Sequence, residues 1–309
     1  MQESTAQLKA ELTGICRRHV GAGLLFSGGL DSGIIAASNP GLKAFTVDFQ
    51  GRGQDIDHSR RLARQLGLKQ TQVRVEREQA LAALPELIKM LKTFDPALPN
   101  DLAAYFGLAA AKAAGVTVVL TGDGSDELFG GYSFMRGIKD LNVYIRRISA
   151  DMRFSSNVIA QHLGLRLVQP FLDKKVVELA LSIPAVDKIR EENGCLHGKW
   201  VLRKAFEDVL PAASVWQDKR PLEIGSGMTH LRAMVESLVS EEEFLADLDG
   251  IKFINREHRH YYRIYKSFFG RPPKAADGLA ACPACAADLG RRLMHCSVCG
   301  WAKELNELQ

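Results

Sequence analysis

Short apolar runs alternate along the first 120 residues with segments whose apolar positions recur at helical spacing. Four apolar runs predict β-strands, at residues 23–26, 44–47, 71–75 and 116–120. Helical spacing predicts helices beside and between them, at residues 6–20, 31–37, 55–66, 78–92 and 101–114. Because strands alternate with helices, we expect an α/β fold in which helices cover both faces of a doubly wound parallel sheet.

The second half of the chain has a different pattern. Residues 134–270 are mostly helical in their spacing, with prolines at positions 170, 184, 211 and 221 as breaks. A segment that contains Pro272, Pro273 and Gly278 follows at 271–281 and predicts a linker. We therefore expect an α/β core at 1–133, a helical part at 134–270, and a small cysteine-rich domain at 282–309 after the linker.

Composition excludes several classes of protein. The 309 residues are 46% hydrophobic and 25% charged, which is typical of a globular chain rather than a disordered one. No stretch approaches the roughly 18 apolar residues of a membrane span, and the polar start Met1–Thr5 does not resemble a signal peptide. A net charge of +4 is too small to indicate nucleic-acid binding by itself. We expect a soluble, cytoplasmic protein without membrane contact.

A glycine-containing loop joins the first predicted strand to the next helix. It reads Ser27-Gly28-Gly29-Leu30-Asp31-Ser32. Backbone N–H groups at such a strand-to-helix junction form an anion site, to which Ser27 and Ser32 add hydroxyl donors. Asp31 would repel a bare phosphate, so its role would be to hold Mg²⁺ that bridges phosphates. An ordinary strand-to-helix turn is the alternative.

A second loop, at 121–132, follows the strand at 116–120 and is rich in acidic residues and glycine. Carboxyl ends of parallel strands share one edge of a sheet, so this loop is expected to face the first one across a crevice. Asp123, Asp126 and Glu127 are its carboxylates. We interpret Asp126 as a metal ligand, whereas Glu127 fits either a polar site or an acidic first helical turn.

Four cysteines near the carboxyl end form two C-x-x-C pairs, Cys282/Cys285 and Cys296/Cys299. Four thiolates in this arrangement fit a tetrahedral Zn²⁺, which would stabilise a segment too short for a core of its own. We predict a structural zinc ribbon, because no ligand position is left open for catalysis. An iron–sulfur cluster and His295 as a fourth ligand are weaker alternatives.

The segment at 254–269 before the linker has the spacing of an amphipathic helix. Four basic residues fall on one side, Arg256, Arg259, Arg263 and Lys266, and four aromatic ones near the other, Tyr261, Tyr265, Phe268 and Phe269. The simpler interpretation is an aromatic core face with a solvated basic face. The alternative is that this face joins the ribbon in binding RNA phosphates.

The two loops together resemble those of the asparagine synthase family, in its synthetase domain, one of the PP-loop ATP pyrophosphatases. The resemblance extends from about residue 8 to residue 227 and includes the segments Pro170–Asp173, Gly198–Arg203, Leu210–Pro211 and Trp216–Lys219. Each short motif is weakly specific, but their order and spacing together are strongly specific. Accordingly, the resemblance identifies 1–133 as a PP-loop core.

The resemblance implies a site for ATP and Mg²⁺ and assigns roles to particular positions. Pyrophosphate would lie against Ser27, Gly28, Gly29 and Ser32. Adenosine would contact Leu25, Val47 and Gly122. Mg²⁺ would bind Asp31 and Asp126, while Lys199 and Lys219 would neutralise charge during adenylation. Asp123 stands where the family has a glutamate near the nucleophile.

The predicted function is adenylation of a small carboxylate by ATP, with release of pyrophosphate and then amide formation. A family segment resembling Gly-Leu-Glu-x-Arg-x-Pro-Phe-Leu-Asp has Arg166 and Val168 in place of its Glu and Arg. We interpret this as a charge inversion near the acyl subsite, which puts aspartate as the substrate in question. Position 2 is Gln rather than the Cys of a glutaminase domain. We therefore expect ammonia from solution or from a separate protein.

Two alternatives stay open. One is a tRNA-modifying enzyme of the thiolation type that binds RNA through the ribbon and the basic helix, with a sulfur donor that is either another protein or Cys195, close in sequence to Lys199. The other is a non-catalytic nucleotide-binding subunit. The acyl substrate, the nitrogen or sulfur donor and the oligomeric state are not specified by the sequence.

Overall fold

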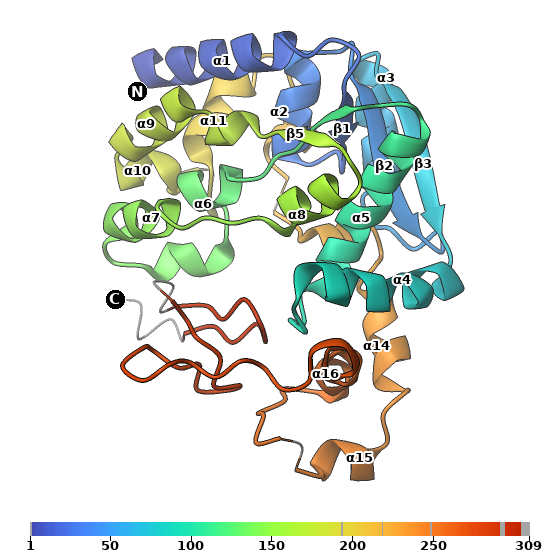
Figure 1. The fold of residues 1–309 in the computed structure, drawn as a ribbon. Coiled ribbons are helices and arrows are strands. Elements are labelled where there is room, and N and C mark those ends of the chain that lie inside the picture. Colours follow the sequence, from blue (N-terminus) through green and yellow to red (C-terminus); the bar gives the residue numbers. More distant parts are fainter. Residues whose placement is uncertain (1, 193, 218, 248, 291–293, 304–309) are drawn as a thin grey trace.

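The computed structural model describes residues 2–192, 194–217, 219–247, 249–290 and 294–303. Within these ranges a five-stranded parallel sheet forms the centre, in the order β3-β2-β1-β4-β5 (Figure 1). The strands are β1 (Gly23–Leu25), β2 (Lys43–Phe49), β3 (Lys69–Val75), β4 (Val118–Leu120) and β5 (Arg166–Val168).

Helices cover both faces of this sheet, so the predicted doubly wound α/β fold is confirmed (Figure 1). One face packs against α1 (Gln2–Arg17), α2 (Leu30–Ser38) and α3 (Ile56–Gln65). The other packs against α4 (Arg77–Leu91), α5 (Leu98–Ala113) and α8 (Ser155–His162). Most apolar side chains of β1, β2 and β4 are buried because helices lie on both sides of them.

The helical part of the chain packs in both layers and contains short strands that the sequence pattern did not predict. Its elements are α6 (Ser125–Phe129), η1 (Ser133–Gly137), α7 (Leu141–Ser149), η2 (Pro170–Leu172), α9 (Lys174–Ser182), α10 (Ala185–Lys188), α11 (Trp200–Phe206), α12 (Ala212–Val215), α13 (Leu222–Gly225), α14 (His230–Glu236) and α15 (Glu241–Leu245). Between α8 and η2 lies β5, whose three residues are too few to show a period. A small antiparallel hairpin, β6 (Arg190–Glu192) and β7 (Cys195–His197), precedes α11.

Helix α16 (Arg256–Phe269) and the cysteine-rich tail pack beneath α4 and the start of α5 (Figure 1). Phe94, between α4 and α5, is fully buried, and its ring centroid lies 5.0 Å from that of Tyr262 and 5.1 Å from that of Tyr265. The four tail cysteines belong to the same buried cluster. The tail is therefore part of the core on this side. The segment predicted as a linker pairs with the tail, because Lys274 and Ala281 form isolated bridges with Ala287 and Asp288.

The predicted basic face of α16 needs a correction. Arg259 is only 4% exposed and donates from Nη1 to the Ala246 carbonyl at 2.8 Å, so it does not lie on a solvated face. The other three basic residues are in ion pairs, Arg256 with Glu241, Arg263 with Glu243 and Lys266 with Asp249. Acidic side chains from the segment before the helix thus already neutralise its basic residues. Helical spacing alone could not reveal these partners.

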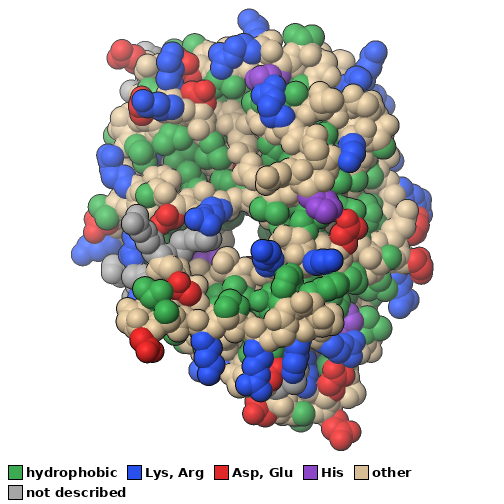
Figure 2. All heavy atoms as spheres, in the orientation of Figure 1, with side chains coloured by type: hydrophobic (Ala, Val, Ile, Leu, Met, Phe, Trp, Pro, Cys, Tyr) green, Lys and Arg blue, Asp and Glu red, His purple; other side chains and the backbone are tan. Residues whose placement is uncertain are grey.

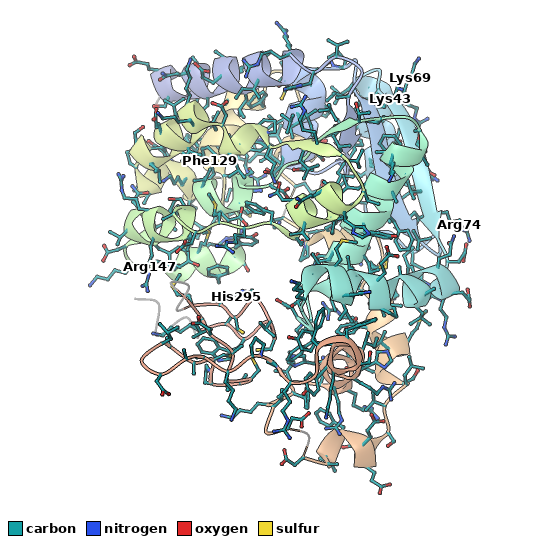
Figure 3. All side chains as sticks on the ribbon, viewed as in Figure 1. Lys43, Lys69, Arg74, Phe129, Arg147 and His295 are labelled. Atoms are coloured by element: carbon teal, nitrogen blue, oxygen red, sulfur yellow. The ribbon has the colours of Figure 1, made fainter. Side chains whose placement is uncertain are left out.

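The outer surface is mixed in charge, and Lys69 and Arg74 extend from the edge strand β3 (Figure 3). On the face shown in Figure 2 the surface is hollowed near its centre, with Lys and Arg side chains beside the opening. None of the helices among the described residues has the length and apolar character to span a membrane.

Candidate active site

The first glycine loop folds tightly over the carboxyl end of β1. Gly28 has φ of +82°, and a Cβ atom there would come within 2.7 Å of the Ser59 Cα atom, so both the conformation and the space require glycine. The Ser27 hydroxyl accepts from the Gly29 N–H at 3.3 Å and lies 3.3 Å from the Ser32 hydroxyl. These groups converge at the start of α2, where a helix N-terminus favours an anion.

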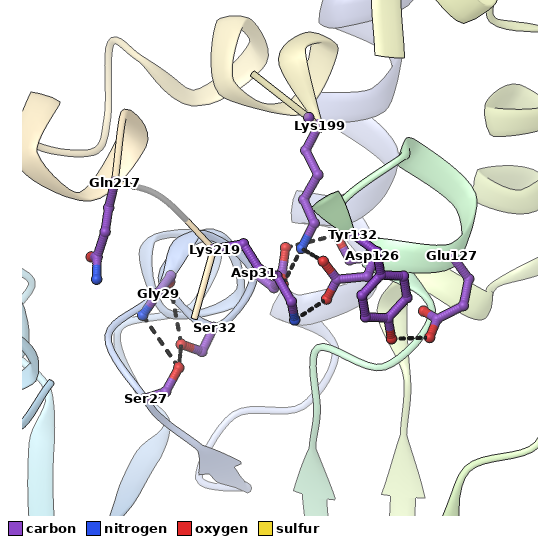
Figure 4. Close-up of polar contacts among 12 residues, drawn as sticks. Ser27, Gly29, Asp31, Ser32, Asp126, Glu127, Tyr132, Lys199, Gln217 and Lys219 are labelled. Atoms are coloured by element: carbon purple, nitrogen blue, oxygen red, sulfur yellow. Dashed lines mark hydrogen bonds and ion pairs between the residues drawn. The ribbon is translucent and has the colours of Figure 1, made fainter. Parts of the chain in front are cut away.

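A cluster of two lysines and two aspartates lies beside this loop (Figure 4). The Lys199 Nζ atom is 2.6 Å from Asp31 Oδ2 and 2.7 Å from Asp126 Oδ1. The Lys219 Nζ atom is 2.7 Å from the other oxygen of Asp126. The carboxylates of Asp31 and Asp126 therefore already share one cation, the Lys199 ammonium. The sequence placed these four residues in one site, and the structure brings all four together.

Burial and charge act in opposite directions on the cluster. Burial pushes the pKa of Asp126 upward, but Lys199 and Lys219 hold that pKa below its ordinary value. Burial likewise pushes the pKa of Lys199 downward, while Asp126 and Asp31 keep it above its ordinary value. Both residues consequently stay charged at neutral pH. A buried arrangement of fixed charges of this kind suits the binding of a polyanion with its metal.

Glycines in two distant motifs bring Lys199 to the aspartates. The Lys199 N–H donates to the Phe129 carbonyl at 3.0 Å, which joins the start of α11 to the end of α6. At Gly198 a Cβ atom would collide with the Gly130 carbonyl, and at Gly131 it would lie 2.8 Å from the Asp126 Cα. Lys199 itself has φ of +56°, an uncommon conformation for a residue with a side chain. The close approach explains why glycine occupies these positions.

The second loop contributes two more carboxylates, those of Asp123 and Glu127. One Asp123 oxygen, Oδ2, accepts from three donors: Thr121 Oγ1 at 2.7 Å, Ser156 Oγ at 2.7 Å and Gln169 Nε2 at 2.8 Å. Glu127 accepts from the Tyr132 hydroxyl at 2.6 Å, and burial raises the pKa of Glu127. Both of these carboxylates line the cavity described next, so Glu127 belongs to the site as well as to the first turn of α6.

A cavity of about 780 Å³ joins the two loops. Its walls contain every predicted nucleotide-site residue except Gly28: Leu25, Ser27, Gly29, Asp31, Ser32, Val47, Gly122 and Asp126, together with Asp123, Lys199 and Lys219. Its volume is that of a small-molecule site. Further lining residues were missed from the sequence, namely Asn100, Phe134, Arg136, Phe154, Ser155, Ser156, Gln217 and Arg220. Several of these come from loops and helix starts that carry no motif.

The interpretation of Arg166 as a charge inversion near the acyl subsite needs a correction. Arg166 starts β5, and its N–H donates to the Thr117 carbonyl, before β4 begins. It therefore lies at the opposite end of the strands from the two loops. Gln169, at the other end of β5, is the residue of this segment that reaches the site, through its bond to Asp123. Arg166 and Gln169 lie at opposite ends of β5, a three-residue strand that the sequence pattern did not predict.

Asp101, in the first turn of α5, is expected to make the stability of the protein depend on pH. Burial raises the pKa of Asp101 to about 7, and the Ser155 hydroxyl donates to it at 2.5 Å. A carboxyl whose pKa is raised in the folded state favours folding when protonated, and this contribution is lost as pH rises through about 7. Asp101→Asn is therefore expected to increase the free energy of unfolding by about 3 kcal/mol at pH 8 and by little at pH 4.

Urea unfolding of both proteins at pH 4, 6 and 8 would measure this difference. Asp57→Asn is a matched control, because Asp57 is an exposed helical aspartate on α3. An Asp101→Asn difference that does not change between pH 4 and pH 8 would contradict the assignment.

The four tail thiols form a compact group. The Cys282 and Cys299 sulfur atoms are 3.6 Å apart, those of Cys285 and Cys296 are 3.7 Å apart, and all four lie within 4.8 Å of one another. Zinc–sulfur bonds of about 2.3 Å in a tetrahedron place sulfur atoms about 3.8 Å apart. The thiols thus fit one tetrahedral ion rather than a multi-iron cluster, whose thiolates bind separate iron atoms. His295 is not a member of the group and pairs instead with Asp95 at 3.3 Å. Cys195 is exposed and does not line the cavity.

The family model for asparagine synthase matches residues 6–162 and 139–268. The chain belongs to the asparagine synthase family. A probable glutamine-hydrolysing asparagine synthetase from Dictyostelium discoideum is 30% identical over 259 residues, which cover 72% of this chain and 46% of that protein. Asparagine synthetase B from Escherichia coli is 27% identical over 289 residues, covering 82% and 51% respectively. The chain thus spans about half the length of these relatives.

Among solved structures, a U34-tRNA thiolase from Methanococcus maripaludis with its 4Fe–4S cluster aligns with all of this chain and 91% of its own, at 13% identity and a TM-score of 0.36. A predicted tRNA methyltransferase subunit from Methanocaldococcus jannaschii aligns with 62% of this chain at a TM-score of 0.28. Both TM-scores are too low to support a conclusion about this protein.

Proposed function

We propose that this protein is an ATP-dependent ligase that adenylates a small carboxylate, releases pyrophosphate and forms an amide with a nitrogen nucleophile. The observation that carries the proposal is the Lys199–Asp31–Asp126–Lys219 cluster, which lines the cavity next to the phosphate-type loop. Membership of the asparagine synthase family supports the same reaction class.

In the proposed reaction a carboxylate oxygen of the substrate attacks the α-phosphorus of ATP. The bond from that phosphorus to the β-phosphate bridging oxygen breaks, so that pyrophosphate leaves with the electron pair. The nitrogen nucleophile then attacks the acyl carbon of the adenylate, AMP leaves, and the nitrogen loses a proton. Two anions must approach each other in the first step, which requires fixed positive charge nearby.

The residues of the cavity fit distinct parts of this reaction. We assign pyrophosphate to Ser27, Gly28, Gly29 and Ser32, and adenosine to Leu25, Val47 and Gly122. Lys199 and Lys219 would neutralise the charge that builds up on the phosphates. Asp31 and Asp126 would hold Mg²⁺, for which their oxygens, already sharing the Lys199 ammonium, are suited. When bound, Mg²⁺ would neutralise the leaving pyrophosphate.

Asp123 is assigned to the acyl side of the cavity. Its Oδ2 atom is held by Thr121, Ser156 and Gln169, so the carboxylate has a fixed orientation. We propose that it orients the nitrogen nucleophile, which would be ammonia from solution or from a separate protein. For the tail we propose zinc, because the sulfur separations fit a single tetrahedral ion.

An RNA substrate is a second candidate, favoured by a specific feature of the cavity mouth. Arg136 is exposed and lines the cavity, and the Phe134 ring beside it stacks on Tyr132 with 5.6 Å between centroids. Aromatic rings and arginine together can bind an unpaired base. The basic residues of α16 do not contribute to this surface, since they are buried or paired.

The test is pyrophosphate release from ATP and Mg²⁺ with ammonium, adding aspartate in one reaction and bulk tRNA in another. Asp31→Ala is expected to abolish release, because Asp31 belongs to the phosphate-type loop, pairs with Lys199 and accepts from the Ser125 hydroxyl of the second loop. Aspartate-dependent release with formation of asparagine would establish amidation of aspartate, whereas release only with tRNA would support RNA modification. Equal release by the unaltered protein and Asp31→Ala would contradict the proposed site.

A further inference from the structure

The tail contacts residues 93–97, which join α4 to α5, as well as Lys252 and helix α16. The Val298 carbonyl accepts from the Phe94 N–H at 2.8 Å and from the Thr93 hydroxyl at 3.1 Å. His295 pairs with Asp95 at 3.3 Å, and Gly300 lies directly against Asp95 and Pro96. Most of these contacts therefore come from the second cysteine knuckle, residues 296–300.

The metal ligands fix the shape of that knuckle. Cys296 and Cys299 are each 1% exposed, and the Gly300 N–H donates to the Cys296 carbonyl at 2.9 Å. Val298 and Gly300, which contact the main body, lie within one residue of Cys299. A metal bound to the four thiolates would hold these two residues in the conformation that meets residues 93–97. Without it, two short loops lacking a core of their own would lose that restraint.

The segment at 93–97 leads directly into a wall of the cavity. Helix α5 starts at Leu98, and three residues of its first two turns, Asn100, Ala103 and Ala104, line the cavity. Asn100 also fixes the opposite wall, because its Oδ1 accepts from the Glu223 N–H at 3.0 Å at the start of α13. One turn farther along, Gly107 is so close to β1 that a Cβ atom there would lie 2.7 Å from Leu25 Cδ2. A shift of α5 would therefore change the part of the cavity around Leu25, which is a residue assigned to adenosine.

We infer that the metal-bound knuckle at 296–300 positions α5 and thereby sets the affinity of the cavity for MgATP. The inference rests on the proposed function only in taking MgATP as the ligand of the cavity. The tail is then a support for the nucleotide site. Its metal acts on ATP binding through residues 93–97, without touching the nucleotide.

Gly300→Ala tests the contact without removing a cysteine. A Cβ atom at this position would lie 2.6 Å from Asp95 Cγ and 2.9 Å from Pro96 Cδ, so the contact between the knuckle and residues 95–96 must change. Gly278→Ala is the matched control, because Gly278 also has a positive φ, +83° against +76°, but has nothing within 4 Å of the added atom. We expect Gly300→Ala to bind MgATP about tenfold more weakly, as a small displacement of one wall would cause. Gly278→Ala should bind it like the unaltered protein.

A second comparison removes the metal with a chelator and follows three quantities: metal content, the Kd for MgATP and amide hydrogen exchange in residues 93–113. We expect the metal-free protein to show the same weakening of MgATP binding and faster exchange in α5. If far-UV circular dichroism shows that chelation unfolds the whole chain, the MgATP affinity of the metal-loaded Gly300→Ala protein is the test of the inference.

Unchanged MgATP affinity in metal-free or Gly300→Ala protein would overturn the inference and make the tail an independent appendage. If the unaltered protein binds no MgATP, the proposed function fails instead. Hydrogen exchange of α5 then still decides whether the metal supports this helix, since that readout needs no nucleotide.

Discussion

Lys199→Met is expected to lower pyrophosphate release by about 100- to 1,000-fold, the usual cost of removing one preorganised charge from a transition state. The side chain is 2% exposed and contacts both Asp31 and Asp126. The same change leaves the buried Asp126 with one lysine, Lys219, and removes the lysine that contacts the partly exposed Asp31. It should therefore also reduce the free energy of unfolding by about 3 kcal/mol. Steady-state kinetics and urea unfolding measure the two effects.

Lys188→Met is the matched control for the loss of a buried lysine. Lys188 is fully buried on α10, donates to Asn142 Oδ1 at 2.9 Å and does not line the cavity. Burial lowers the pKa of Lys188 to about 8, so its charge is poorly accommodated there. Replacement by methionine should leave activity unchanged and stability equal or higher. Equal activity loss in both variants would show that Lys199 acts only through folding.

Gly131→Ala is the second change for which a large effect is expected. It alters no ionisable group, but the added Cβ would collide with the Asp126 carboxylate and the Lys199 side chain and lie 2.8 Å from Asp126 Cα. Displacing the cluster by about 1 Å should reduce kcat/KM about 100-fold. The pH dependence of the residual activity should change as well, because the Lys199–Asp126 contact opposes the effect of burial on the pKa of each residue.

Gly14→Ala serves as its control, since Gly14 lies in α1 with nothing within 4 Å of the added atom. It should retain full activity and be slightly more stable, because alanine favours a helix over glycine by about 1 kcal/mol. Full activity in Gly131→Ala would mean that the cluster tolerates displacement and that its geometry is not what the reaction requires.

The sequence predicted the central part of this site because its chemistry lies in motifs placed after strands. Ser27, Asp31 and Asp126 follow β1 and β4, and a parallel sheet necessarily brings their strand ends together. The family resemblance added Lys199 and Lys219, which no periodicity could have connected to Asp31 across 168 and 188 residues of chain. The thiol group was likewise predictable, because its spacing is local.

Other features depend on partners that are distant in sequence and leave no local pattern. Arg259 was expected on a solvated face, yet the Ala246 carbonyl binds it in the interior. Arg166 was expected near the acyl subsite. The sequence did not reveal that it lies at the far end of a strand, because β5 has only three residues and therefore no detectable alternation of apolar and polar positions. Asn100 and Ser155 line the cavity through the packing of α5 and α8, which follows from tertiary structure alone.

The strand order has a consequence for biosynthesis. Central strand β1 pairs with β2 on one side and with β4 on the other, through Leu24 to Ala44 and Leu24 to Leu120. As the chain leaves the ribosome, β1 to β3 can pair at once, but the second side of β1 stays unpaired until residues 118–120 emerge. An unpaired apolar strand edge is a template for misassembly. The interval between synthesis of β3 and synthesis of β4 should therefore be the stage at which this protein most needs a chaperone.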